Sequence, residues 1–282
     1  MASSAPTLRA FNLAFVQLGH VPQLIVLPNA TLKFTGNDDR RLNSPYGATH
    51  FPAYAETIGY IPGEPYDIAK SESDTVKMLS SVAKETGTWL FGGTIPEREA
   101  STGNLYNTAT VYSPQGELVA LYRKIHLFDI DIPGKSHLSE TLTGGSSPHY
   151  FDTEFARVGL GICYDVRFPE LTAIGARKGC QVFIYPGASN MTTGPLHWQL
   201  LQRRGKADMF FGMCSPARDL GAGYHAWGHS LVVDPMGAVL AEAGHEEEII
   251  HVHIDPQVFE DARAGIPVTT QRRFDVYPDV SA

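Results

Sequence analysis

Residues 157–213 alternate between strand-like and helix-like segments, and this order constrains the fold more than any other feature. Apolar runs at 157–162, 181–185 and 209–213 have the length of buried strands. Helices are predicted over 168–178 and from Pro195 to about residue 204. Strand–helix–strand units place parallel strands in one sheet, because the helix carries the chain back to the starting edge. The chain is therefore predicted to have an α/β fold.

Two hairpins add antiparallel strands to this parallel core. Residues 108–112 and 118–123 enclose Ser113-Pro114-Gln115-Gly116, and residues 231–233 and 238–240 enclose Asp234-Pro235-Met236-Gly237. Proline second and glycine fourth are typical of a type I turn. No Pro/Ser/Gly-rich linker divides the chain. We therefore predict one domain over residues 1–282, with an irregular polar insert at 29–42 and a tail at 265–282.

A further helix is predicted between the early strands and the first hairpin. Val76, Leu79, Val82 and Ala83 recur at helical spacing, Ser73 is a suitable N-cap, and Gly87 follows the last turn. These four apolar side chains are expected to share the buried face of the helix.

The first two predicted strands, 11–18 and 23–27, conflict with a simple parallel arrangement. Only residues 19–22 lie between them, whereas a parallel crossover needs a dozen or more residues. We therefore expect that they turn back on each other as a tight antiparallel pair, or that one of them leaves the sheet.

Composition excludes several classes of protein. Apolar types make up 43% of the residues, charged types 18%, and the net charge is −8, so a basic surface for nucleic acid or anionic membranes is not expected. No apolar run approaches the length of a membrane span. Three cysteines and a start without a basic, apolar leader favour a reducing compartment. We expect a cytoplasmic protein, with a mitochondrial location as the alternative.

Cys163 is the first candidate for chemistry. It follows an apolar strand that contains Gly159 and Gly161, and it precedes a helix. Glycines there allow a sharp turn, and the amino end of a helix favours a thiolate. The alternative is a small buried hydrophobic residue, which is the interpretation we prefer for Cys180 and Cys214.

Lys124 ends an apolar strand and is followed by further apolar residues. Such a lysine either extends its ammonium group to water or is held where its charge is used. The 11 histidines raise the question of a metal, but His225 with His229 and His251 with His253 lack the surroundings of a metal site. We expect no metal and no cofactor. A distant histidine paired with Cys163 stays open as a third kind of hydrolase.

Several segments together resemble the nitrilase superfamily of carbon–nitrogen hydrolases. The resemblance is closest to the omega-amidase branch, whose members deamidate 2-oxoglutaramate and related monoamides. It is carried by Asn43-Ser44-Pro45-Tyr46-Gly47, by Arg123-Lys124-Ile125-His126 within 122–135, by Gly161-Ile162-Cys163-Tyr164-Asp165 within 159–168, and by 185–188, 215–219 and 271–277.

The resemblance implies a four-layer α-β-β-α sandwich, with the first βα unit truncated in this chain. It also implies a Glu–Lys–Cys triad. Cys163 would attack the amide carbon, and Lys124 with a backbone N–H would stabilise the oxyanion. Glu140 occupies the position of a second glutamate that orients the substrate and the lysine.

The general base does not match the family. Where the family has Leu-Pro-Glu, this chain has Leu27-Pro28-Asn29, and an amide cannot take up and release a proton as a carboxylate does. The first crossover helix is missing, and the segment after Arg203 is shortened. These departures are abrupt and lie beside well-matched sequence, which favours missing exon segments over gradual divergence.

Arg167 lies about one helical turn beyond Cys163 and could hold the distal carboxylate of a dicarboxylic monoamide. Alternatively, it pairs with Asp165 or Asp129 and braces the turn. By resemblance, Tyr46, Tyr164 and Thr193 line the substrate pocket. The leading hypothesis is an amidase for such a small-molecule amide, and the alternative is a non-catalytic member of the fold that serves in binding or assembly.

Apolar side chains in the tail predict a homo-oligomer. Val268, Phe274, Val276 and Tyr277 follow the last regular element, and exposing such a group to water is unfavourable. The resemblance implies that tails of this kind pack against a partner subunit.

Overall fold

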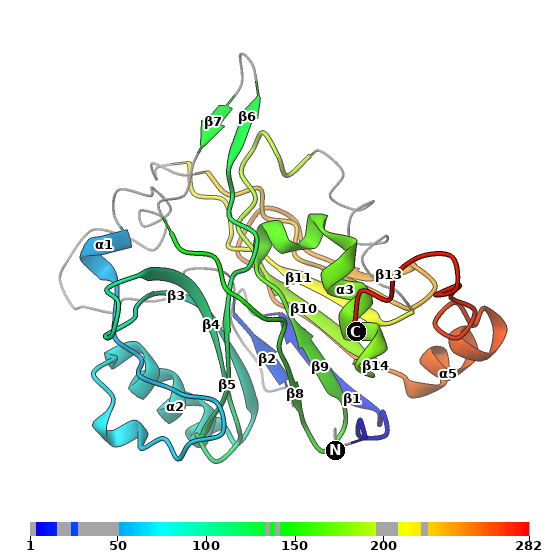
Figure 1. The fold of residues 1–282 in the computed structure, drawn as a ribbon, viewed down its shortest axis with the longest axis horizontal. Helices are drawn as coiled ribbons and strands as arrows, with labels where there is room; N and C mark the ends of the chain where they lie inside the picture. Colours follow the sequence, from blue (N-terminus) through cyan, green and yellow to red (C-terminus); the bar gives the residue numbers. More distant parts are fainter. Residues whose placement is uncertain are drawn as a thin grey trace.

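A computed structural model describes residues 4–15, 24–27, 51–132, 136–138, 142–195, 208–220 and 225–281. Most of its strands form two six-stranded sheets (Figure 1). The first sheet has the order β14-β1-β2-β3-β4-β5. Its strands are β1 (Phe11–Phe15), β2 (Leu24–Val26), β3 (Trp89–Arg98), β4 (Leu105–Tyr112), β5 (Leu118–Arg123) and β14 (Ile250–Ile254).

The second sheet has the order β13-β12-β11-β10-β9-β8. Its strands are β8 (Tyr150–Asp152), β9 (Arg157–Leu160), β10 (Val182–Pro186), β11 (Phe210–Cys214), β12 (Leu231–Val233) and β13 (Val239–Glu242). The strands β9, β10 and β11 are parallel, as predicted. A separate antiparallel pair consists of β6 (Ile130–Ile132) and β7 (Ser136–Leu138).

Helices flank the two sheets. The described helices are α1 (Phe51–Tyr54), α2 (Asp74–Thr86), α3 (Pro169–Arg177) and α5 (Pro256–Gly265), with the short 3₁₀ helices η1 (Ile68–Lys70) and η2 (Cys163–Arg167). In Figure 1, α2 lies on the outer side of the first sheet and α3 on the outer side of the second. The layers are thus α-β-β-α, as expected. Among the described residues, no helix is long and apolar enough to cross a membrane.

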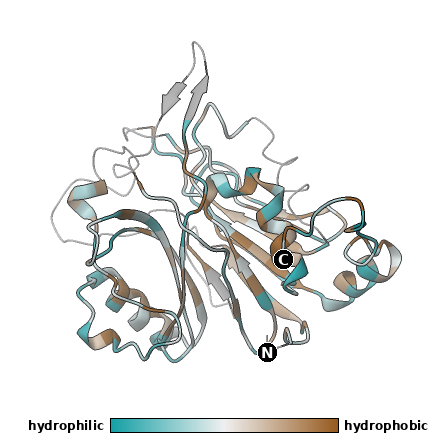
Figure 2. Cartoon of the chain, in the orientation of Figure 1, coloured by the Kyte–Doolittle hydropathy of each residue, from teal (hydrophilic) through white to brown (hydrophobic). Residues whose placement is uncertain are grey.

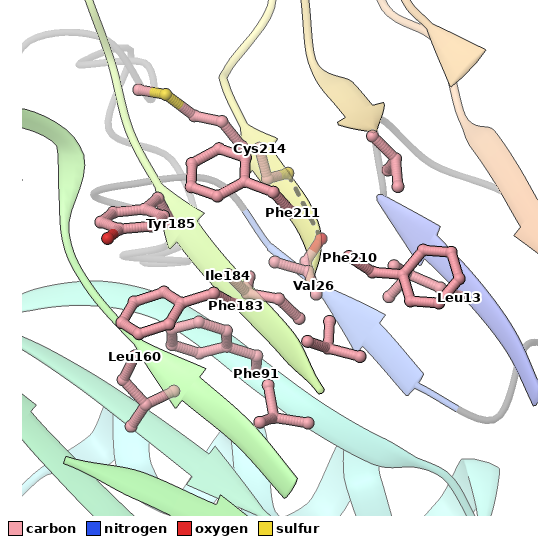
Figure 3. Close-up of a cluster of buried hydrophobic side chains, with 14 of the residues drawn as sticks. Leu13, Val26, Phe91, Leu160, Phe183, Ile184, Tyr185, Phe210, Phe211 and Cys214 are labelled. Atoms are coloured by element: carbon pink, nitrogen blue, oxygen red, sulfur yellow. Dashed lines mark hydrogen bonds between the residues drawn. The ribbon is translucent and has the colours of Figure 1, made fainter. Parts of the chain in front are cut away.

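The inner faces of the two sheets pack against each other. The ring of Phe15 on β1 lies so close to Gly212 on β11 that a Cβ there would come within 2.2 Å of the ring. At the end of the same strand, the Cys214 thiol donates to the carbonyl of Val26 on β2 over 3.5 Å (Figure 3). Strands of both sheets carry much of the apolar colour in Figure 2. Apolar burial therefore holds the sheets together.

An aromatic layer separates the second sheet from α3. The Phe183 ring lies against Gly159 on the neighbouring strand and against Gly175 of α3. A Cβ on Gly161 would lie 2.1 Å from the Tyr185 ring. These strand glycines therefore make room for aromatic rings, and neither of them has a positive φ angle.

Both predicted hairpins form. In the first, the Gly116 amide donates to the Ser113 carbonyl over 2.8 Å, and in the second Gly237 donates to Asp234 over 3.0 Å. Both glycines have positive φ angles, of 84° and 87°. Glycine tolerates this conformation because it lacks a Cβ.

The predicted helix is α2, and its caps are as expected. The Ser73 hydroxyl accepts from the Val76 amide, and Gly87 adopts the left-handed conformation. Val76, Leu79 and Ala83 are buried, but Val82 is 37% exposed, so its assignment to the buried face is wrong. The other three positions already fill the face toward the sheet, and Val82 lies at its margin.

The prediction for the first two strands is also wrong, because β1 and β2 are parallel neighbours in one sheet. The described part of β1 ends at Phe15, and β2 begins at Leu24. Leu13 pairs with Leu24 and Phe15 with Val26. Along the strand direction, Leu24 therefore lies only about two residues, or roughly 7 Å, back from Phe15, a shorter return than the crossover rule assumes. The connection and the insert at 29–42 lie outside the described residues.

Candidate active site

The site lies where the carboxyl ends of strands from both sheets meet. Cys163 follows β9, Gly187 follows β10, and Cys214 ends β11. In the first sheet, β5 runs in the same direction as β2, because β2 and β3 are parallel and two antiparallel pairings follow. The contact between Cys214 and Val26 brings the two sets of strand ends together. Ligands of α/β sheets commonly bind at this edge.

Cys163 begins the 3₁₀ helix η2, and two residues separate it from the end of β9, so it lies between a strand and a helix as the sequence predicts. Its φ angle is +47°, a left-handed conformation that is unfavourable for a residue with a Cβ. Strain of this kind is typical of functional sites. Gly187 permits the arrangement, since a Cβ there would lie 3.2 Å from the Cys163 Cα.

The three cysteines have different environments. Cys163 is half-buried, whereas Cys180 and Cys214 are buried. Burial raises the pKa of Cys180 to about 12, and burial likewise raises the pKa of Cys214. Both keep their protons at neutral pH, so they are buried hydrophobic residues as expected. Cys163 is the only one of the three that solvent reaches.

Lys124 lies immediately beyond β5, and only 2% of it is exposed. The interpretation in which its ammonium group extends to water is therefore wrong. Its amide donates to the Asn107 carbonyl, and its own carbonyl accepts from the Gly145 amide. A buried ammonium group needs a compensating partner, which favours a site where its charge is used.

Asp165 connects the segment of Cys163 to that of Lys124. It is fully buried, and it accepts hydrogen bonds from the Ile162 amide, the Tyr122 hydroxyl and the amide and ring of His126. The His126 ring stacks on Phe168, with ring centroids 3.6 Å apart. This role was not anticipated, because nothing in the local sequence of Asp165 shows that β5 would lie beside it.

Three of the predicted substrate-pocket residues lie together. The Arg167 guanidinium donates to the Thr193 carbonyl over 3.4 Å and lies 5.8 Å from the Tyr164 ring. The described atoms of Asp165 and Asp129 form no ion pair with Arg167, so the alternative in which Arg167 braces the turn through them is wrong. The Thr193 hydroxyl donates to Asn190.

Other predicted site residues fall outside the described part of the chain. These are Asn29, Tyr46 and Glu140. The described residues contain no group of three or more histidine, cysteine or carboxylate side chains that could hold a metal ion.

The family follows from comparison with known proteins. The sequence profile described as "Carbon-nitrogen hydrolase" matches residues 21–264. The chain belongs to the carbon–nitrogen hydrolase family.

Relatives of this hydrolase are similar over most of its length. Omega-amidase NIT2 of Homo sapiens is 53% identical over 239 residues, which are 83% of this chain and 81% of that protein. Hydrolase C26A3.11 of Schizosaccharomyces pombe is 52% identical over 242 residues, 84% of this chain and 71% of that protein. The expected resemblance to omega-amidases is confirmed.

Solved structures agree with the sequence relatives. The crystal structure of Saccharomyces cerevisiae Nit3, a member of branch 10 of the nitrilase superfamily, matches with a TM-score of 0.78 and 40% identity. The match covers 96% of this chain and 100% of that chain. The four-layer sandwich of this hydrolase is thus of the nitrilase type.

Proposed function

We propose that this carbon–nitrogen hydrolase is an amidase built around Cys163, acting on the side-chain amide of a small dicarboxylic monoamide such as 2-oxoglutaramate. The observation that carries the proposal is the half-buried Cys163, held in a left-handed conformation at the edge where both sheets end. The omega-amidases among its relatives supply the substrate class. We propose that the whole chain, residues 1–282, forms the one domain that carries this activity.

In the proposed reaction, the Cys163 thiolate attacks the amide carbon and forms a tetrahedral intermediate. The Lys124 ammonium and a backbone N–H next to Cys163 stabilise the oxyanion, an interaction that is strong in a buried site. The C–N bond then breaks, the nitrogen takes a proton and leaves as ammonia, and an acyl thioester remains. Water attacks the thioester, and the acid leaves with regeneration of the thiol. Glu140 is assigned to orient substrate and lysine.

The proton transfers need a general base, and this chain has Asn29 at the family's position for it. Glu56 lies further along the chain but is engaged elsewhere, since it accepts hydrogen bonds from Ser73 and Thr75 at the start of α2. This shortage of a base supports the second candidate function. In that reading the chain is a catalytically impaired member of the fold that binds a small ligand or serves in an assembly.

Arg167 is the proposed anchor for the substrate's distal carboxylate, with which a guanidinium can form two parallel hydrogen bonds. Its only described hydrogen bond is the long one to the Thr193 carbonyl. Tyr164 and Thr193 are its neighbours in the proposed pocket. Tyr46 is assigned to the pocket with them.

We also propose that the protein assembles as a homo-oligomer in the cytoplasm or in mitochondria. Val276 is 69% exposed and Tyr277 44% exposed. Arg177 of α3 pairs with Asp279 and lies over the Phe274 ring, so the tail follows the surface of its own chain and leaves these apolar groups outward. Sedimentation at micromolar concentration tests this, and a monomer would count against it.

Ammonia release from 2-oxoglutaramate tests the amidase, with Cys163→Ala as the inactive control. Pentanamide has the same chain length but no carboxylate. Arg167→Met should raise KM for 2-oxoglutaramate at least tenfold and leave the slow reaction of pentanamide unchanged, because only the first substrate has an anion to lose. Mass spectrometry of an acyl thioester on Cys163 separates the two functions. If neither ammonia nor a thioester appears, the non-catalytic function is supported.

A further inference from the structure

Asp165 receives hydrogen bonds from three segments of the chain. Its Oδ2 accepts from the Ile162 amide at 3.0 Å and from the Tyr122 hydroxyl at 2.7 Å. Its Oδ1 accepts from the His126 amide at 2.9 Å and from the His126 Nδ1 at 2.7 Å. Four donors use the full capacity of an ionised carboxylate, which has no proton of its own to give.

These donors surround the two reactive residues of the proposed function. Ile162 directly precedes Cys163 in the second sheet's segment, while Tyr122 and His126 lie two residues before and two residues after Lys124. Asp165 is therefore bonded to the backbone beside the thiol and to both sides of the lysine. Because it is fully buried, water does not compete for these bonds.

An amide of the same shape cannot replace this carboxylate. Each carboxylate oxygen of Asp165 accepts from one backbone N–H. The Ile162 N–H donates to Oδ2, and the His126 N–H donates to Oδ1. The Tyr122 hydroxyl can rotate and the imidazole can change its tautomer, but neither backbone N–H can become an acceptor. The nitrogen of an asparagine would therefore face a backbone donor in either orientation, and the two segments would separate.

We propose that Asp165 is a positioning residue that sets the distance between the Cys163 thiol and the Lys124 ammonium. This inference rests on the proposed function, in which the two groups act together. Placement errors of about 1 Å can cost roughly 100-fold in rate, so a bond network of this kind affects reactivity as well as folding.

Alkylation of Cys163 by iodoacetamide tests the inference without needing amidase turnover. The thiolate attacks the methylene carbon and iodide leaves, and the mass of the Cys163 peptide reports the rate. Rates between pH 6 and 9 are compared for the unaltered chain, Asp165→Asn, Lys124→Met and the double variant. A neighbouring ammonium lowers a thiol pKa, and one unit changes the thiolate fraction about tenfold.

We expect Lys124→Met and Asp165→Asn each to slow alkylation at pH 7 about tenfold. The double variant should be no slower than Lys124→Met, since Asp165 would act through the lysine. Asp152→Asn is the matched control, because it removes a carboxylate paired with the buried Arg157, away from this turn. It should leave the alkylation rate unchanged even where it lowers stability.

Several outcomes would overturn the inference. An unchanged rate in folded Asp165→Asn, or effects of the two substitutions that multiply, would reduce Asp165 to a structural role while leaving the lysine–cysteine pairing intact. An unchanged rate in Lys124→Met would refute the pairing itself, and the positioning role with it. If Asp165→Asn does not fold, Tyr122→Phe removes one donor alone and should slow alkylation about threefold, which is the scale of a single hydrogen bond.

Discussion

Two carboxylates each collect hydrogen bonds at the start of a helix, Asp165 at η2 and Glu56 at α2. Glu56 accepts from the Ser73 hydroxyl and from the amide and hydroxyl of Thr75. All of these donors belong to one local segment outside the first sheet. The donors to Asp165 come from segments of both sheets. The same side-chain chemistry therefore secures one helix in the first case and the geometry of a site in the second.

The hydrogen bonds of Glu56 and Asp165 also explain why neither carboxylate can serve as the general base of the proposed amidase. A general base has to reach the proton that it takes, over about 2.6–3.2 Å or through one water. Glu56 faces the first turn of α2, where its charge also favours the helix amino end. Asp165 is saturated by donors on both oxygens. If the proposed amidase uses a general base, that base is neither of these two carboxylates.

The largest expected effect tests that conclusion. The chain as it stands should release ammonia about 10²–10⁴-fold more slowly than a version with Asn29→Glu and the family's first crossover restored, which is the usual contribution of a general acid–base group. Asn29→Gln in the restored chain is the matched control and should stay slow, because it keeps an amide. Steady-state turnover of 2-oxoglutaramate measures the difference. Full activity of the unaltered chain would contradict the prediction, whereas recovery with Asn29→Glu alone would show that the restored crossover is not required.

The second effect is on stability. Glu56→Gln should lower the free energy of unfolding by about 1–2 kcal/mol, because a charged acceptor at the cap of α2 becomes a neutral one. The urea midpoint at constant slope measures it. The exposed Glu72 provides the control, and Glu72→Gln should change stability by less than about 0.5 kcal/mol. The alkylation rate of Cys163 should be the same in both variants. A slower rate in Glu56→Gln would show that Glu56, like Asp165, affects the reactivity of Cys163.

Local signals made much of this fold predictable. Ser73 begins α2 because its hydroxyl accepts from a backbone amide of the first turn, and Gly87 ends the helix because it adopts the left-handed conformation. The turns at Gly116 and Gly237 require residues that accept positive φ. The position of Cys163 between a strand and a helix could be found in the same way, since its neighbours in sequence create it.

What the sequence did not reveal depends on partners that are distant along the chain. Gly161 lies beneath the ring of Tyr185, and Asp165 lies beside Tyr122, 43 residues away. The error at β1 and β2 arose because a long crossover was expected, whereas the parallel register brings Leu24 back only to the level of Leu13. Apolar sequence predicts that a strand is buried but does not determine the register in which two strands pair.

The smallest effect concerns His149. Its ring meets the ring of Tyr122 edge-on, with centroids 6.5 Å apart, and Tyr122 is one of the donors to Asp165. Burial lowers the pKa of His149 below its ordinary 6.5. The unfolded chain therefore binds this proton more readily than the folded chain does, so stability should fall as the pH is lowered through 6.5 toward the folded-state pKa. Below both pKa values the contribution of His149 to stability becomes constant.

His149→Gln should remove this part of the dependence of stability on pH. The measurement is the difference between the urea midpoints of this variant and those of the unaltered chain from pH 5 to 8. His251→Gln, on the exposed side of β14, should keep the slope. Equal slopes in the unaltered chain and His149→Gln would mean that this imidazole reaches water in the folded state, and that the packing of Tyr122 beside Asp165 is looser than its hydrogen bond implies.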